Sequence, residues 1–263
     1  MEKYFGFAKE LLNKGYASEV DSYGEDNLYD INIDDTSDVD FYLKLANECK
    51  GNILDIGCGT GRILKPLLDA GHEGVGIDLS ASMLKIAKEK LSKAGHEPNL
   101  LQGDMRDFQI NEDFSLVVIP NCSMIYIDND DDRKKVFKTA YQHLKKGGVF
   151  AFDFDAEIVP IEETKPWLSS QTLHPSTGEL IVSTVQMNGI NENLRLINMT
   201  NYQYKENNDC TITVNASFEA TCVPEKIVEL LQSEGFNVRG IYSDYHFTPY
   251  KSGELCVIVA EKY

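Results

Sequence analysis

The chain has 263 residues, of which 25 are Lys or Arg and 42 are Asp or Glu, so its formal net charge is −17. This charge argues against a nucleic-acid backbone or an anionic membrane as the main partner, because both would repel an acidic surface. Hydrophobic residues make up 42% of the chain, which is ordinary for a globular protein. The length suits one large domain with a sizeable core, and we expect a single domain over residues 1–263.

The apolar runs and the cysteines predict a cytoplasmic protein. No apolar run approaches the roughly 20 residues that span a bilayer, and no apolar core of a signal peptide follows the first residues. None of the six cysteines forms a C-x-x-C pair. We therefore expect reduced thiols, no disulfide framework and no metal site.

Residues 1–50 are predicted to form a mostly helical N-terminal segment. Phe5, Ala8 and Leu11 lie at helical spacing. The stretch 16–40 is rich in Tyr and Asp and has no clear period, so its residues alone indicate an acidic surface loop whose tyrosines pack on the core.

The pattern strand, glycine turn, helix begins at residue 53. The apolar run 53–56 is typical of a buried strand, and Gly57, Gly59 and Gly61 follow it at alternate positions. Glycine permits a positive φ and close approach of a ligand to the backbone, and a helix N-terminus offers free N–H groups. The arrangement therefore predicts a site for a nucleotide-like ligand, with the helix beginning near Thr60 or Gly61.

The spacing of this motif is D-x-G-x-G-x-G, starting at Asp55. It differs from the G-x-G-x-x-G fingerprint of dinucleotide sites, which disfavours a nicotinamide-dependent oxidoreductase. It resembles motif I of the class I S-adenosylmethionine-dependent methyltransferases. The resemblance implies S-adenosylmethionine as cofactor, Asp55 near the ammonium group of its amino acid end, and Cys58 among the glycines of the donor site. From the residues alone, a plain glycine-rich turn remains the alternative.

The second predicted strand, 74–78, ends in Asp78, which follows Gly57 by 21 positions. An acidic side chain at this point can accept hydrogen bonds from both ribose hydroxyls. The alternative role is to cap the next helix, but Ser80 can perform that role.

A helix is predicted over 81–93. The resemblance places the start of this helix beside the adenosine, so Leu79 and Met83 are candidate contacts, although helical spacing alone assigns Met83 to the core.

A third strand is predicted over 100–104, followed by G-D-M-R-D-F. This motif resembles the one after the third strand of the family, which implies that Asp104 and the Met105 N–H contact the adenine edge; a plain turn is the alternative.

The apolar run 114–119 predicts a strand buried on both faces, and Asn121 and Tyr126 follow it. The resemblance places this segment near the transferred methyl group, so Asn121 is a candidate contact of the methyl donor, S-adenosylmethionine, and Tyr126 is a candidate catalytic residue. The tetrapeptide Asn/Asp-Pro-Pro-Tyr/Phe of nucleic-acid adenine methyltransferases is absent here, which favours a small-molecule acceptor. L-K-K-G-G before the predicted strand 148–153 is common in the family and has a packing role.

After residue 153 the βα rhythm stops. Alternating patterns and turns at Asn188-Gly189 and Asn207-Asn208 predict three antiparallel strands within an insertion over about 160–222. We expect this insertion to cover the active site and to select the substrate. The resemblance likewise implies that the 1–50 segment is a lid over the ligand, which makes Tyr23 a candidate catalytic residue.

Near the C-terminus, Tyr242-Ser243-Asp244-Tyr245 resembles a motif of methyltransferases that dimethylate amino sugars. His246 beside it is a candidate substrate-side base, and a surface histidine is the alternative reading.

Together, these motifs predict a doubly wound α/β fold. Its sheet is mostly parallel and seven-stranded, Rossmann-like, with an antiparallel β insertion. The expected function is transfer of a methyl group from S-adenosylmethionine to a small-molecule acceptor, an amine in our interpretation, by in-line displacement in which proximity is the main catalytic effect. A non-catalytic S-adenosylmethionine-binding module and a methyltransferase acting on protein or RNA are the alternatives. We expect no DNA or membrane partner, and a monomer or homodimer.

Overall fold

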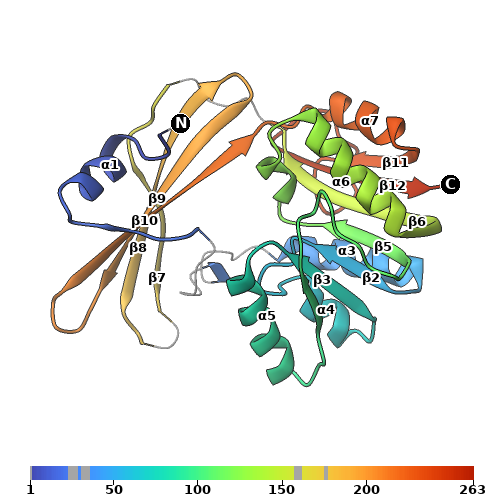
Figure 1. Cartoon of the computed structure of the whole chain (residues 1–263), viewed down its shortest axis with the longest axis horizontal. Helices are drawn as coiled ribbons and strands as arrows, with labels where there is room; N and C mark the ends of the chain where they lie inside the picture. The colour runs from blue at the N-terminus through green and yellow to red at the C-terminus, as the bar shows by residue number, and fades with distance from the viewer. Residues whose placement is uncertain (1, 23–28, 31–35, 157–161, 175–176) are drawn as a thin grey trace. The chain divides into compact units, whose positions relative to one another are not determined.

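The computed structural model describes residues 2–22, 29–30, 36–156, 162–174 and 177–263. The chain divides into two compact units (Figure 1). The first unit comprises Met1–Asp34 and Ile158–Ala220, and the second comprises Asp35–Glu157 and Thr221–Tyr263. In the described ranges, no helix is both long enough and apolar enough to cross a membrane.

The second unit is built on a seven-stranded sheet in the order β11-β12-β6-β5-β2-β3-β4. Strands β6, β5, β2, β3 and β4 pair in parallel, whereas β12 is antiparallel to both of its neighbours. The predicted fold class is therefore confirmed. The strands are β2 (Ile53–Ile56), β3 (Gly74–Asp78), β4 (Asn99–Gln102), β5 (Phe114–Ile119), β6 (Leu144–Asp155), β11 (Phe236–Tyr242) and β12 (Leu255–Lys262).

Two apolar cores lie on the two faces of this sheet, because successive strand residues point to opposite faces. On β2, Leu54 and Ile56 belong to the core that contains side chains of α6 and α7. Ile53 belongs to the other core, with Phe41 and Tyr42 of α3. The helices of this unit are α3 (Ser37–Cys49), α4 (Leu64–Asp69), α5 (Ala81–Lys93), the 3-10 helix η1 (Ser123–Tyr126), α6 (Asp130–His143) and α7 (Pro224–Ser233).

Helix α4 begins at Leu64, later than the predicted start near Thr60 or Gly61. The cause is Pro66, which has no N–H to donate to the carbonyl four residues earlier. A start at Leu64 places Pro66 in the first turn, where N–H groups have no partner within the helix. The intervening residues form a turn that the Gly61 N–H closes on the Cys58 carbonyl at 2.8 Å.

The first unit contains a five-stranded sheet in the order β1-β10-β9-β8-β7, antiparallel except for β1 beside β10. The predicted antiparallel insertion is thus confirmed, with β7 and β1 as additional strands. Strand β7 is mostly exposed, so its sequence shows little apolar alternation. The elements are α1 (Gly6–Asn13), β1 (Ser18–Glu19), β7 (Trp167–Leu173), β8 (Leu180–Asn191), β9 (Leu194–Tyr204) and β10 (Cys210–Ala220).

Helix α1 has no capping side chain of its own, and two buried amides of the sheet bind its start. Asn198 accepts a hydrogen bond from the Phe5 N–H at 3.0 Å, and Gln186 accepts one from the Phe7 N–H at 3.1 Å. These bonds satisfy N–H groups that a helix leaves without internal partners. The chain's first helix is therefore attached to strands that lie about 190 residues away in sequence.

The turn predicted at Asn188-Gly189 is wrong, because β8 continues to Asn191 through a register shift between Gly189 and Asn191. The reversal follows Asn191, whose side chain accepts the Asn193 N–H at 2.8 Å. Asn favours this kind of local turn. The second predicted turn, at Asn207-Asn208, lies between β9 and β10 as expected.

Candidate functional site

The glycine motif after β2 forms a turn that requires glycine. The φ angles of Gly57, Gly59 and Gly61 are +71°, +53° and +77°, in the left-handed region that disfavours residues with a Cβ. The Gly57 and Cys58 N–H groups both donate to the Ile77 carbonyl of β3, at 2.7 and 2.9 Å. The turn is therefore fixed to the end of the neighbouring strand.

Asp78 is the last residue of β3, and its carboxylate bridges the glycine turn and α5. One oxygen accepts the Gly59 N–H at 2.8 Å and the other accepts the Ser80 N–H at 2.8 Å. Burial raises the pKa of Asp78, and these two bonds oppose that shift. Because a carboxylate offers about four acceptor sites, Asp78 retains capacity for further donors such as ribose hydroxyls. The predicted helix cap is confirmed, since the Ser80 hydroxyl accepts the Met83 N–H at 3.3 Å.

Asp55 of β2 is fully buried, and neither of its carboxylate oxygens has a hydrogen-bond partner among the described residues. Burial raises the pKa of Asp55 to about 7, the carboxylates of Asp78 and Asp38 add to the shift, and Arg62 opposes it. A buried carboxylate without partners is costly unless a cation or a donor approaches it. The ammonium group of an amino acid fits this requirement.

Arg62 follows the glycine turn and binds Asp38 in the first turn of α3. Its two terminal nitrogens lie 2.7 and 2.5 Å from the two Asp38 oxygens, and both side chains are largely buried. The pair therefore joins α3 to the glycine turn with the planar geometry that Arg and a carboxylate favour.

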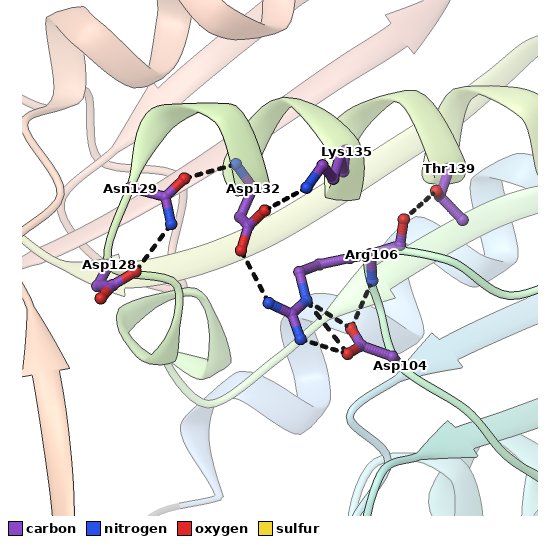
Figure 2. Close-up of polar contacts among 7 residues, drawn as sticks. All are labelled: Asp104, Arg106, Asp128, Asn129, Asp132, Lys135 and Thr139. Atoms are coloured by element: carbon purple, nitrogen blue, oxygen red, sulfur yellow. Dashed lines mark hydrogen bonds and ion pairs between the residues drawn. The ribbon is translucent and has the colours of Figure 1, made fainter.

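Asp104 lies after β4, in a turn closed by the Asp107 N–H and the Asp104 carbonyl at 3.0 Å. Figure 2 shows Arg106 between Asp104 and Asp132, with the Arg106 Nη2 2.6 Å from Asp104 and Nη1 2.8 Å from Asp132. This contact holds the pKa of Asp104 below its ordinary value. Thr139 of α6 donates to the Arg106 carbonyl at 3.0 Å, so α6 fixes both ends of Arg106.

The apolar candidates differ in exposure. Leu79, directly after β3, is 67% exposed, which leaves it accessible to a flat apolar ligand such as a base. Met83 is buried, as helical spacing predicted. Met105 is partly buried against the core that contains side chains of α6 and α7. Its methyl group lies 4.0 Å from the position that a Cβ on Gly57 would take.

The segment after β5 contains two adjacent non-glycine residues with positive φ, Asn121 at +58° and Cys122 at +55°. This conformation costs roughly 1–2 kcal/mol for a residue such as Cys122 and less for Asn, which visits the left-handed region more readily. Both N–H groups donate to the buried carboxylate of Asp153 on β6, which also accepts the Tyr42 hydroxyl at 2.6 Å. Sequence analysis did not single out Asp153 or Tyr42, and the apolar pattern around Asp153 was the one available signal, since a carboxylate inside a buried strand needs a partner.

Two of the three catalytic candidates, Tyr126 and His246, lie in the described ranges, on different elements. Tyr126 is the last residue of η1 and packs partly buried against the core. His246 is exposed in the connection between β11 and β12, where its N–H donates to the Asp244 carboxylate at 2.8 Å. Tyr23 lies outside the described residues.

The candidate cofactor-binding residues share one edge of the sheet. Each lies at or just after the carboxyl end of a parallel strand, where open α/β sheets bind ligands. The arrangement combines a left-handed glycine turn, a buried carboxylate with no hydrogen-bond partner in the described ranges, and an acidic strand end. The residues are Asp55, Gly57, Cys58, Gly59 and Gly61 from β2, Asp78, Leu79 and Met83 from β3 and α5, Asp104 and Met105 after β4, and Asn121 after β5.

Comparisons with known proteins bear on the family and the fold of this chain. Residues 53–148 match the family model described as "Methyltransferase domain". A Bacillus subtilis protein, YqeM, that carries a methyltransferase name is 40% identical over 118 residues, which are 42% of this chain and 47% of that protein. The dTDP-3-amino-3,4,6-trideoxy-alpha-D-glucopyranose N,N-dimethyltransferase of Streptomyces venezuelae is 31% identical over 115 residues, 44% of this chain and 47% of the relative. The chain thus matches about half the length of these two relatives.

A solved structure of an S-adenosylmethionine-dependent methyltransferase from Clostridium acetobutylicum ATCC 824 has the same fold, with a TM-score of 0.77 and 22% identity. The match covers 90% of this chain and 95% of the other. Residues 53–148 therefore match a methyltransferase domain, and the chain has the Rossmann-like fold of this solved S-adenosylmethionine-dependent methyltransferase.

Proposed function

We propose that this protein transfers a methyl group from S-adenosylmethionine to the amine of a small molecule. The observation that carries the proposal is the buried Asp55 carboxylate, which has no hydrogen-bond partner in the part of the chain that the structure describes and lies directly before a glycine turn in the left-handed conformation. A ligand with an ammonium group would supply the missing partner. Asp78 would accept from its ribose hydroxyls, and Asp104 with the Met105 N–H would contact its adenine.

When bound, the donor would supply a methyl group that a positively charged sulfur already activates. The chain's own task is then mainly to bind and align, which explains why a catalytic triad is unnecessary. An amine in its neutral form carries a free lone pair and needs only a route for proton loss, whereas a hydroxyl needs a general base. Among the described candidates, His246 is exposed and Tyr126 packs partly buried against the core, so we take an acceptor that needs no general base as the first hypothesis. An amine is such an acceptor.

An amino sugar is the acceptor class that we propose to test first. The Streptomyces venezuelae relative is named for an amino sugar substrate, and the Y-x-D-Y motif before the last strand supports the same class. Selection of the acceptor by the antiparallel insertion, and a lid role of the N-terminal segment, stay predictions.

The proposal is tested in two steps on the full chain. Calorimetric titration with S-adenosylmethionine, its demethylated product and NAD should show micromolar binding of the first two and none of NAD. Incubation with S-adenosylmethionine and dTDP-3-amino-3,4,6-trideoxy-α-D-glucopyranose, followed by mass spectrometry, should then reveal methylated sugar. Binding of NAD alone would contradict the donor assignment. Donor binding without methylation of this sugar or of other amines would instead support a non-catalytic binding module.

A further inference from the structure

The carboxylate of Asp153 receives three hydrogen bonds from two separate segments of the second unit, α3 and the segment after β5. The Tyr42 hydroxyl of α3 donates to Oδ2 at 2.6 Å, the Asn121 N–H donates to the same oxygen at 3.2 Å, and the Cys122 N–H donates to Oδ1. Asp153 and Tyr42 are fully buried. A buried carboxylate with three donors has a fixed orientation, so Asp153 is suited to hold its neighbours in place.

The two backbone donors are the residues with unfavourable φ angles, +58° for Asn121 and +55° for Cys122. Strained backbone of this kind persists only where surrounding contacts determine it, and it concentrates at functional sites. Since both N–H groups converge on one carboxylate, Asp153 selects this conformation of the segment after β5. Asn121 itself is exposed at the same edge of the sheet as the other candidate cofactor-binding residues.

The groups around this contact are charged or aromatic and belong to the same unit. Burial raises the pKa of Tyr245, and the Asp153 carboxylate raises it further, so the Tyr245 phenol stays neutral. The Asp38 carboxylate also raises the pKa of Tyr245, and the Arg62 guanidinium lowers it. Tyr245 packs against Phe41 of α3 with ring centroids 5.9 Å apart, which places the Y-x-D-Y motif beside the helix that carries Tyr42.

We propose that Asp153 is a positioning residue for methyl transfer, which fixes the segment Asn121–Cys122 beside the transferred methyl group through the two backbone N–H groups, with Tyr42 orienting the carboxylate. This inference rests on the proposed function, because it assumes that the segment after β5 faces the transferred methyl group. It extends that function by giving a role to two residues outside the glycine, ribose and adenine motifs.

The first test compares Asp153→Asn with Asp78→Asn, because each carboxylate accepts two backbone N–H groups but only Asp78 is assigned to the donor. Hydrogen–deuterium exchange of the peptide 120–126 should be at least about tenfold faster in Asp153→Asn than in the native protein, since a charge-assisted bond is lost. Calorimetric affinity for S-adenosylmethionine should fall less in Asp153→Asn, which touches the cofactor site only through Asn121, than in Asp78→Asn. Turnover of the dTDP amino sugar should fall about tenfold in Asp153→Asn, mainly in kcat.

The second test uses Tyr42→Phe, which keeps the carboxylate and removes one donor, and it remains informative if Asp153→Asn does not fold. Tyr250→Phe is the matched control, because Tyr250 donates to the Gly253 carbonyl at 3.1 Å in the β11–β12 connection. Tyr42→Phe should accelerate exchange in 120–126 and lower kcat, and Tyr250→Phe should do neither. Unchanged exchange in both Asp153→Asn and Tyr42→Phe would overturn the proposal, as would faster exchange with undiminished kcat.

The exchange measurement needs neither donor nor acceptor. If the native protein binds S-adenosylmethionine but methylates no amine, the proposed function fails and the positioning role in methyl transfer fails with it. If methylation occurs and Asp153→Asn retains full kcat, the positioning role alone fails.

Discussion

The guanidinium of Arg62 and the carboxylate of Asp38 form a two-pronged ion pair, with nitrogen–oxygen distances of 2.7 and 2.5 Å, between the glycine turn and α3. Their side chains are 14% and 5% exposed, so this pair is shielded from water. Removing one member would leave a buried charge without compensation, which is the costly case for buried ion pairs.

Arg62→Ala is therefore expected to lower the free energy of unfolding by about 3 kcal/mol, measured by urea denaturation. Arg62→Lys should recover only part of the loss, because Lys cannot reproduce the two-pronged geometry. Arg195→Ala is a matched control in the first unit, since Arg195 pairs with Glu219 at similar exposure. An Arg62→Ala protein as stable as the native one would show that this pair does not hold the turn to α3.

Donor affinity is expected to depend on pH through Asp55, whose pKa in the free protein is raised to about 7, chiefly by burial. A ligand ammonium favours the ionised form, so affinity should rise with pH up to about 7 and then level off. Below that value each pH unit should weaken binding by up to about tenfold. Calorimetry from mildly acidic to mildly basic pH would measure this, and Asp55→Asn should bind weakly without the dependence.

The Asp55 carboxyl also predicts a pH dependence of stability, which falls with rising pH where the affinity for the methyl donor rises. The folded-state pKa of Asp55 lies above its ordinary value of 3.8, so the native state holds the proton more tightly than the unfolded state. Its contribution to stability is present at low pH and is lost as pH rises towards 7, by up to about 1.4 kcal/mol per unit. The difference in unfolding free energy between the native protein and Asp55→Asn should therefore change across this window, and a constant difference would contradict the burial argument.

Asp78→Ala should weaken binding of S-adenosylmethionine by at least about tenfold, because a charged acceptor for the ribose is removed and the Gly59 N–H loses its partner. Ser80→Ala is the control, since it removes the cap of α5 at a cost of about 1 kcal/mol without touching the carboxylate. Calorimetry and thermal denaturation of both variants separate binding from stability. Equal donor affinity in the two variants would remove the ribose role.

Arg106→Met should weaken donor binding several-fold, because Arg106 holds the Asp104 carboxylate against α6 (Figure 2). The change in stability should stay within about 1 kcal/mol, since the Arg106 side chain is 41% exposed. Lys135→Met is the control, because the exposed Lys135 side chain forms an ion pair with the same Asp132 and is not joined to Asp104 in Figure 2. If Arg106→Met binds the donor like the native protein, Asp104 does not need this support or does not contact the adenine.

Local sequence pattern predicted the strands 53–56, 74–78 and 114–119 and the helix 81–93 with the bounds that the structure has. Their periods and caps are properties of neighbouring residues. The pattern was less informative where tertiary contacts decide the bounds or the existence of an element. The end of α6 and the start of β6 meet at residues 143 and 144, because Leu144 pairs with Phe114 across a register shift. The exposed strand β7 had no apolar alternation to reveal it.

The sequence by itself determined the fold class and the donor-side candidates, because these residues stand in short motifs directly after buried strands. Only the tertiary structure brought together Tyr42 and Asp153, which are 111 positions apart, and Asp38 and Arg62, which are 24 apart. Hydrogen bonds over such separations have no characteristic spacing in a sequence. They form because α3 packs against one face of the sheet, which brings its Asp38 and Tyr42 to buried polar groups that need partners.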